Sequence, residues 1–324
     1  MRTWAIVMAG CLVAAGALAG CSARRAPSVD AGVLAAGDHE FTIRHGGRQR
    51  RYLVHVPGGG TAPHAVMLAL HGGGGSGQQF KDDNGLDAVA DRHGFVAVHP
   101  DGTGPLRERL LTWNAGTDCC GFARDRNIDD VGFLVAVLED LAARTPIDRA
   151  RVYVTGHSNG AMMAYRLAAE RADLVAAVVP VAGAMIVDRF EPSRPVPVLH
   201  IHSVDDPRAL YDGGLGPPFP GTDNRVMHRP VMAGIAAWAS HNACAGDPVA
   251  GEVVAGSGAD RGQTLVRLTW PGCRADVEHL RLTGVGHGWP GAAVAAAMRR
   301  LIGPGTTMIN AGEAAWQFAS QHAH

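Results

Sequence analysis

The chain has 324 residues, enough for one large or two modest domains, and 47% of them are hydrophobic. Its 43 glycines suit a globular α/β protein with many tight turns. The formal net charge is −1, so the composition argues against a nucleic-acid or polyanion partner.

The N-terminus has the pattern of a signal peptide of the lipoprotein type. A short charged start precedes an apolar run over residues 5–17, which is shorter than the roughly 20 residues that a helix needs to cross a membrane. Residues 18–21 (Leu-Ala-Gly-Cys) resemble the bacterial lipobox, which implies cleavage after residue 20 and membrane attachment through a lipid on Cys21. We therefore predict a signal peptide over 1–20 and a flexible tether over 21–37. The alternative is an ordinary secreted protein cleaved nearby; either way the mature chain works outside the cytoplasm.

Strand-like and helical patterns alternate along the rest of the chain. Residues 40–45 and 50–56 predict a hairpin closed by Gly46 and Gly47, and residues 65–70 form the continuous apolar run of a strand buried on both faces. Residues 106–126 and 213–221 are predicted loops. Further strands are predicted at 95–98, 151–155, 175–181, 196–201, 264–270 and 277–282, and helices at 84–93, 161–167, 232–240 and 313–321.

A further helix is predicted between the first loop and the strand at 151–155. Asn127 is its expected N-cap, Asp129 and Asp130 lie in its first turn, and Arg144 closes it. Aspartates in a first turn favour the positive end of the helix dipole, which explains both residues better than a metal or acid pair. The alternation of strands and helices predicts a mostly parallel sheet covered on both faces, in a single domain over 38–324.

The strand at 151–155 runs directly into residues 156–160, Gly-His-Ser-Asn-Gly, and a helical pattern follows. Strand, sharp turn and helix are the context in which this motif forms a nucleophile elbow with Ser158 at its tip. Flanking glycines let strand and helix pass closely. Ser158 is the predicted nucleophile.

A serine nucleophile needs a base and an orienting carboxylate, which in this type of sheet follow it in the order acid, then histidine. His287 lies in a Gly-rich segment after the last strong strand and is the predicted base. Asp205 and Asp206 both follow the strand at 196–201, where such sheets place their sites, and the residues alone leave the pair nearly tied.

The tetrahedral intermediate needs amide donors for its oxyanion. The N–H of Asn159 supplies one by position, and Gly73 or Gly74, in the glycine run after residues 65–70, supplies the other. The glycine run lacks the Gly-Lys-Ser/Thr ending of a phosphate site, and the predicted chemistry needs no cofactor.

Four cysteines remain after residue 21 in the predicted mature chain. Cys244 and Cys273 flank a strand-like insert, which favours a disulfide between them in an oxidising compartment. Cys119 and Cys120 would then form a vicinal pair or stay reduced. A metal site is not predicted, because there is no Cys-x-x-Cys and no matching histidine spacing. His200 and His202 share a strand face, where core packing explains them better than a metal.

Several motifs occur together in order: His-Gly-Gly-Gly-Gly-Ser at 71–76, Trp-Asn-Ala-Gly at 113–116, the elbow, the turn at 202–207 and Gly-His-Gly-Trp-Pro-Gly at 286–291. This set resembles the polyhydroxybutyrate depolymerase and feruloyl-esterase-type family of α/β-hydrolases, including bacterial lipoprotein esterases, over essentially all of the chain after the tether. The resemblance implies an α/β-hydrolase fold, selects Asp206 as the acid because the family's acid precedes a proline, and implies the Cys244–Cys273 pairing. Arg208 falls where the family usually has an apolar run.

We therefore predict a serine esterase outside the cytoplasm that hydrolyses small or oligomeric esters of short-chain, hydroxyacyl, acetyl or feruloyl type. Trp113 and Trp289 are candidates to line an aromatic acyl or sugar site, with packing as their alternative role. Two other functions remain open. An acyltransferase would use the same triad to acylate a sugar or lipid alcohol, and a surface binding protein would keep the fold without a reactive serine.

Overall fold

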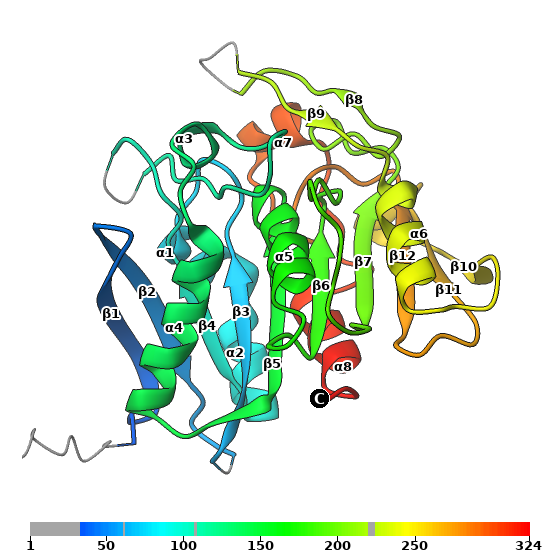
Figure 1. Ribbon diagram of the computed structural model, residues 1–324. Coiled ribbons are helices and arrows are strands. Elements are labelled where there is room, and N and C mark those ends of the chain that lie inside the picture. Colours follow the sequence, from blue (N-terminus) through cyan, green and yellow to red (C-terminus); the bar gives the residue numbers. More distant parts are fainter. Residues whose placement is uncertain (1–32, 61, 107–108, 220–223) are drawn as a thin grey trace, which may run out of the picture.

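The central element of the molecule is a ten-stranded sheet in the order β1-β2-β4-β3-β5-β6-β7-β12-β11-β10 (Figure 1). The computed structural model describes residues 33–60, 62–106, 109–219 and 224–324. The pairs from β4 to β12 are parallel, and the strands at both edges pair antiparallel. The strands span Gly37–His45 (β1), Arg48–Val56 (β2), His64–Leu70 (β3), Val96–Pro100 (β4), Ile147–His157 (β5), Ala177–Val181 (β6), Val198–Ser203 (β7), Val249–Ala255 (β10), Thr264–Thr269 (β11) and Val277–Thr283 (β12).

Helices cover both faces of this sheet. In Figure 1, α4, α5 and α6 lie in front of it, and α2 and α8 lie behind it. Two short strands, Gly214–Leu215 (β8) and Met227–His228 (β9), form a separate ribbon. The helices span Gly77–Asn84 (α1), Leu86–His93 (α2), Gly121–Asp125 (α3), Asp130–Arg144 (α4), Asn159–Glu170 (α5), Val231–His241 (α6), Ala296–Ile302 (α7) and Ala311–Ala319 (α8), with a 3₁₀ turn at Gly258–Asp260.

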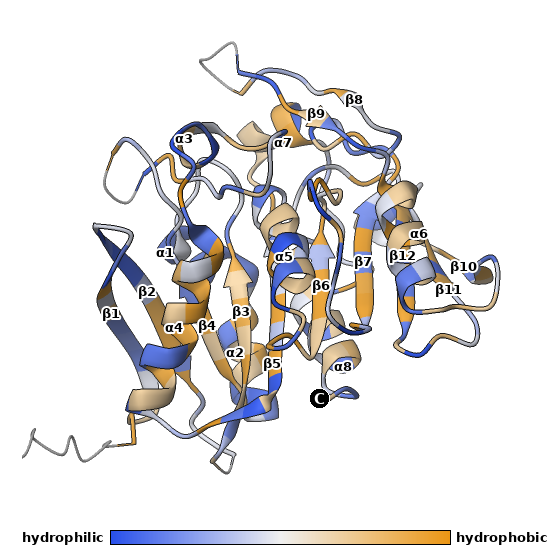
Figure 2. Cartoon of the chain, viewed as in Figure 1, coloured by the Kyte–Doolittle hydropathy of each residue, from blue (hydrophilic) through white to orange (hydrophobic). Residues whose placement is uncertain are grey.

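The core lies on both sides of the central strands. Every residue of β3, β4, β6 and β7 is buried. Because neither face of these strands meets water, most of their residues are apolar, and Figure 2 shows the strands in the middle of the sheet mainly in orange. The predicted mostly parallel sheet with helices on both faces is confirmed.

The start of α4 differs from the prediction. Asp129, not Asn127, is its N-cap: the Asp129 carboxylate accepts a hydrogen bond from the N–H of Gly132 at 2.8 Å. Asn127 stands before it at a φ of 44°, in the left-handed region. Asp130 is buried and pairs with Arg50 at 2.7 Å, which gives it a structural role.

The loops that follow the parallel strands gather at one end of the sheet, where these strands have their carboxyl ends. In Figure 1, α3, α7 and the β8–β9 ribbon lie above the ends of β3, β6 and β7. Sheets of this kind bind ligands at the carboxyl ends of their parallel strands, so we expect the predicted site residues to meet at this end of the sheet.

The predicted signal peptide, most of the tether and Cys21 lie outside the described residues. Within the ranges that the structure describes, no helix combines the length and hydropathy that crossing a membrane requires.

Candidate active site

The turn between β5 and α5 holds Ser158 in an unusual backbone conformation. Its φ of 56° and ψ of −119° lie where few residues other than glycine are found, and its N–H donates to the carbonyl of Val181 at 2.9 Å. The neighbouring glycines have no room for a side chain. A Cβ on Gly156 would lie 2.5 Å from the carbonyl oxygen of Gly160, and one on Gly160 would lie 2.1 Å from that of Leu70. The elbow is thus built by close backbone packing.

We expect Gly160→Ala to lower the free energy of unfolding by about 3 kcal/mol or more, because the new methyl group collides with backbone rather than a movable side chain. Gly58→Ala is the matched control, since a Cβ there meets nothing within 4 Å. Its stability should stay within about 1 kcal/mol of the wild type. Urea denaturation measures both, and equal stability of the two variants would contradict the tight elbow.

The structure brings the three predicted triad side chains into one hydrogen-bonded chain. Nε2 of His287 lies 2.9 Å from Oγ of Ser158, and Nδ1 lies 2.7 Å from Oδ2 of Asp206. The Asp206 side chain is fully buried, whereas that of His287 keeps 11% of its surface exposed. This is the geometry in which a histidine can take a proton from a serine while a carboxylate fixes its other nitrogen.

Asp206 is held in place from several sides. Its Oδ1 accepts the backbone N–H groups of Arg208 at 2.7 Å and Ala209 at 2.8 Å, and its Oδ2 also lies 3.3 Å from Nε2 of His202. Burial alone would raise the pKa of Asp206, but the charge of His287 and the hydrogen bonds from His202 and His287 hold it well below its usual range. The acid therefore stays ionised beside the imidazole.

Asp205 points elsewhere. It is exposed, and its Oδ2 accepts the N–H of Gly284 at 2.6 Å, which ties the loop of the acid to the loop of His287. The structure therefore places Asp206, and not Asp205, against the imidazole.

We expect Asp206→Asn to lower kcat for a p-nitrophenyl ester by about 10²–10⁴-fold, since the amide cannot orient and stabilise the imidazolium as the carboxylate does. Asp205→Asn keeps a side-chain carbonyl that can still accept from Gly284. Its kcat should fall by less than about tenfold. Steady-state kinetics of the two variants test the assignment, and the reverse order of losses would move the acid to Asp205.

His157, which the sequence reasoning did not single out, also supports the base. Its Nε2 donates to the carbonyl of His287 at 2.8 Å, and the two ring centroids lie 4.9 Å apart. Burial, together with the charge of His287, lowers the pKa of His157 to about 3, so the ring is neutral at ordinary pH. The signal was present in the sequence, because His157 directly precedes the nucleophile.

The structure separates the two glycines proposed as oxyanion donors. The Gly74 N–H donates to the carbonyl of Leu111 at 2.8 Å. This N–H is therefore not available to an oxyanion, and the prediction of Gly74 as a donor is wrong. Gly73 lies beside the start of α5, where a Cβ on it would come within 3.4 Å of Cβ of Asn159. The Asn159 amide is in the first turn of α5, where N–H groups lack intrahelical acceptors. Gly73 and Asn159 therefore remain the candidate donors.

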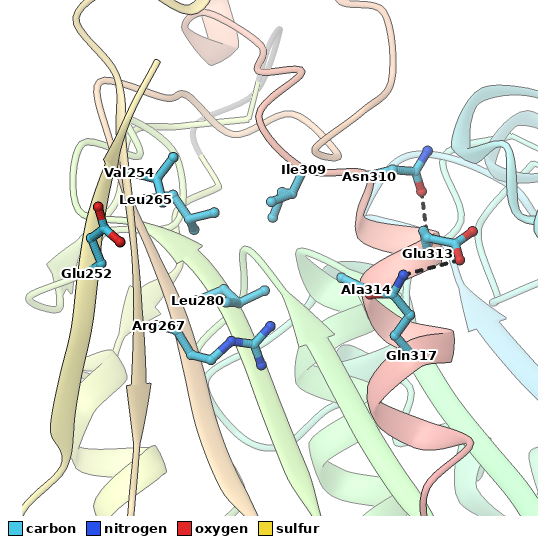
Figure 3. A pocket seen from close by; sticks show the side chains of 10 residues that line it. All are labelled: Glu252, Val254, Leu265, Arg267, Leu280, Ile309, Asn310, Glu313, Ala314 and Gln317. Atoms are coloured by element: carbon cyan, nitrogen blue, oxygen red, sulfur yellow. Dashed lines mark hydrogen bonds between the residues drawn. The ribbon is translucent and has the colours of Figure 1, made fainter.

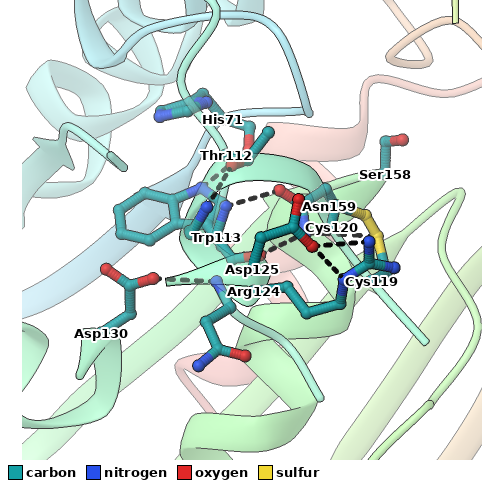
Figure 4. Close-up of a disulfide and its surroundings, with 12 residues drawn as sticks. His71, Thr112, Trp113, Cys119, Cys120, Arg124, Asp125, Asp130, Ser158 and Asn159 are labelled. Atoms are coloured by element: carbon teal, nitrogen blue, oxygen red, sulfur yellow. Dashed lines mark hydrogen bonds and ion pairs between the residues drawn. A yellow bond between two sulfur atoms is a disulfide. The ribbon is translucent and has the colours of Figure 1, made fainter. Parts of the chain in front are cut away.

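The side chain of Asn159 ties the loop before α3 to the elbow (Figure 4). Its Oδ1 accepts from Trp113 N at 2.7 Å, and its Nδ2 donates to Trp113 O at 3.0 Å. The Trp113 indole is fully buried and donates to the carbonyl of His71 at 3.0 Å. Trp289 is also buried and packs edge-on against Phe80. The prediction that Trp113 and Trp289 line a substrate site is wrong, because both rings are used in packing.

A pocket opens beside Ser158 and His287. Its walls are mostly apolar, and they include the buried pair Cys119–Cys120, whose sulfurs are joined (Figure 4). The other predicted pairing, Cys244–Cys273, links the segment after α6 to the turn between β11 and β12. The remaining lining residues are Asn159, Met162, Arg208, Ala209, Pro217, Phe219, Val226 and His228.

A second hollow lies away from this site, between β10–β12 and α8 (Figure 3). Its lining includes Arg267, Leu280 and Gln317 and none of the predicted site residues.

One group of side chains has the composition of a cation site. Ligand atoms of Asp38, His55 and Asp87 lie within 4.8 Å of one another. The ammonium of Lys81 already lies between the carboxylates, 2.9 Å from Asp38 and 2.5 Å from Asp87. A lysine therefore supplies the positive charge there, and the group is explained as an ion-pair network.

The strand–Ser158–helix turn, with its acid and histidine on loops after later parallel strands, defines the molecule as an α/β-hydrolase. The chain belongs to the esterase PHB depolymerase family, whose pattern it matches over residues 51–245. The predicted family and fold are thereby confirmed.

Relatives with assigned names are esterases. The chain is 36% identical over 172 residues to the Nocardia uniformis subsp. tsuyamanensis protein named "Putative esterase NocK", covering 52% of this chain and 48% of that one. It is 27% identical over 277 residues to feruloyl esterase C of Emericella nidulans, covering 83% of each. The acetyl xylan esterase of Aspergillus awamori shares the fold, with a TM-score of 0.54 at 14% identity over 81% of this chain and 97% of that one. The chain thus spans about half the length of the first of these relatives.

Proposed function

We propose that the protein is a carboxylic ester hydrolase that works through Ser158, His287 and Asp206. The observation that carries the proposal is the continuous chain of hydrogen bonds from Ser158 Oγ through the imidazole to Asp206. Family membership and the names of the relatives support the same reaction class.

The geometry suggests the order of steps. Ser158 Oγ attacks the ester carbonyl as His287 Nε2 takes its proton, and the N–H groups of Gly73 and Asn159 donate to the oxyanion. His287 then gives the proton to the departing alcohol, which leaves an acyl-serine. Water attacks this acyl group while the imidazole takes one of its protons. His287 then gives that proton to Ser158 Oγ as the bond between Oγ and the acyl carbon breaks, and the carboxylic acid product leaves.

The substrate is proposed to be a short-chain, hydroxyacyl, acetyl or feruloyl ester. Support comes from the relatives, which are named as feruloyl and acetyl xylan esterases, and from the apolar walls beside the nucleophile. The site of action is proposed to be outside the cytoplasm, with a lipid on Cys21. The support for that address is the N-terminal pattern, and mass spectrometry of the N-terminal peptide from the native host tests it.

The decisive experiment is labelling with a fluorophosphonate, followed by a panel of esters that differ in acyl chain and aromatic content. Labelling at Ser158 together with turnover is the expected result. A protein that neither labels nor turns over any ester would be a binding protein on a hydrolase scaffold. Product analysis with an added alcohol distinguishes an acyltransferase, which would form a new ester instead of free acid.

A further inference from the structure

We propose that Arg208 makes the active site selective for esters that carry a carboxylate. The inference rests on the proposed esterase function and concerns the same pocket. Arg208 lines that pocket together with Ser158 and His287.

The backbone fixes where Arg208 stands. Its N–H donates to Oδ1 of Asp206 at 2.7 Å, which fixes the main chain of Arg208 two residues after the triad carboxylate. On the Arg208 side this contact uses only the main-chain N–H, so the side chain takes no part in it. A substitution at Arg208 can therefore change the pocket while keeping the hydrogen bond to Asp206.

The guanidinium lies on one wall of the pocket. Its Nη2 donates to the carbonyl of Pro218 at 3.1 Å, and its Cζ lies 5.9 Å from the centre of the Phe219 ring. The edge of Phe219 in turn lies 3.5 Å from where a Cβ of Gly73 would stand. Arg208 and Phe219 thus follow one another along a wall that reaches the candidate oxyanion glycine.

Burial lowers the pKa of Arg208, and the nearby charge of Asp206 offsets part of this effect without forming an ion pair with the guanidinium. The structure shows no ion pair between this guanidinium and a carboxylate of the described residues, and both oxygens of the nearby Asp206 already accept hydrogen bonds from other groups. The described pocket lining contains no aspartate or glutamate. Burial lowers the pKa of His228 to about 4, so that neighbour is neutral at pH 7.

A half-buried guanidinium in a pocket whose described lining holds no carboxylate is suited to one kind of ligand. Its planar fork matches the two oxygens of a carboxylate, and the reduced access of water strengthens the attraction. An ester with a carboxylate on its acyl or alcohol part would supply the missing partner.

The test compares matched ester pairs on the purified protein. The p-nitrophenyl hemisuccinate and pentanoate place the carboxylate, or its neutral replacement, on the acyl side; p-carboxyphenyl acetate and phenyl acetate do so on the alcohol side. In Arg208→Gln we expect the anionic-to-neutral ratio of kcat/KM to fall about tenfold or more for one pair, mainly through KM. High salt should weaken the preference of the wild type and leave that of the variant unchanged.

Arg149→Gln is the control, because Arg149 is exposed, pairs with Glu139 at 2.7 Å near the start of β5, and loses the same charge. Its ratio should match the wild type. An equal loss on both members of each pair in Arg208→Gln would show that Arg208 only supports the Pro218 loop, and would overturn the proposal. A wild type that hydrolyses neutral esters without charge preference would also overturn it while leaving the esterase function intact. Absence of any hydrolysis or labelling would instead defeat the function itself.

Discussion

Ser158→Ala is expected to lower kcat for a short p-nitrophenyl ester by about 10⁴-fold or more. The variant keeps the fold, because the backbone N–H of residue 158 still donates to Val181, but it has no oxygen to attack the carbonyl. The remaining activity would come from the oxyanion donors and substrate binding alone. Steady-state kinetics, with active-site titration to exclude contaminating wild type, measures the loss.

His287→Ala should cause a similar loss, and the double variant with Ser158→Ala should be no worse than either single one, because the two groups act in one proton transfer. His93→Ala is the matched control, since His93 is exposed on α2 and pairs with Glu313 at 2.8 Å, far along the chain from the triad. Its kcat should stay close to the wild type. Near-full activity in Ser158→Ala would remove the serine from the mechanism.

The site was predictable where short segments of sequence carry the chemistry. The five consecutive residues 156–160 identify Ser158 as the nucleophile. Asp206 and His287 are identified by their positions after strands, in a known order along the chain. The oxyanion donors could not be separated in this way. Gly74 is excluded as an oxyanion donor because its N–H bonds to the carbonyl of Leu111. Leu111 lies in another loop, and no local sequence pattern predicts that contact.

The prediction that Trp113 and Trp289 line the substrate site was wrong for a related reason. An aromatic residue next to site motifs can face the substrate or the core, and its neighbours in sequence do not decide between them. The indole of Trp113 faces inward, where its Nε1 donates to the carbonyl of His71, and Asn159 holds the main chain of the same residue. The place of His157 beside Ser158 pointed to the site, but its contact could not be predicted because the acceptor, the carbonyl of His287, lies 130 residues away.

The fold was predictable where elements bury an apolar face. The unpredicted elements β10 and α7 lack such a face. All seven residues of β10 are exposed, and α7 has no buried residue, so neither shows a periodic apolar pattern. In α1 most residues are polar, and the helix is defined instead by its N-cap, Ser76, which accepts the N–H of Gln79.

Acid is expected to destabilise the protein well above the pH at which its carboxylates titrate. Burial lowers the pKa of several histidines to about 3 or about 4, against about 6.5 in an unfolded chain. Above pH 7 these rings are neutral in both states and contribute nothing. As the pH falls below 6.5 the unfolded chain binds protons that the folded chain excludes, so the free energy of unfolding falls until the pH reaches the folded values. The histidines are His71, His99, His157, His228 and His279.

Each such histidine removes about 1.4 kcal/mol per pH unit over this window, so five together remove on the order of 5–10 kcal/mol between pH 7 and pH 5. His55 acts in the opposite direction: although burial alone would lower its pKa, hydrogen bonds to Asp38 and Asp91 raise it. Burial also raises the pKa of Asp87 and Asp130, so these two carboxyls oppose the histidines as well. The low pKa of Asp206 adds a further loss only at still lower pH. Urea denaturation at several pH values measures the slope, which gives the difference in bound protons directly.

His99→Leu tests the cause. Both ring nitrogens of His99 are buried without a hydrogen-bond partner, so leucine removes a proton-excluding group without removing a hydrogen bond. We expect the variant to be at least as stable as the wild type near pH 7 and to lose stability toward pH 5 with a slope smaller by about one proton. The same change at exposed His93 is the control and should keep the wild-type slope. An unchanged slope in His99→Leu would mean that His99 takes up its proton in the folded state, and the buried histidines would then not be the origin of acid sensitivity.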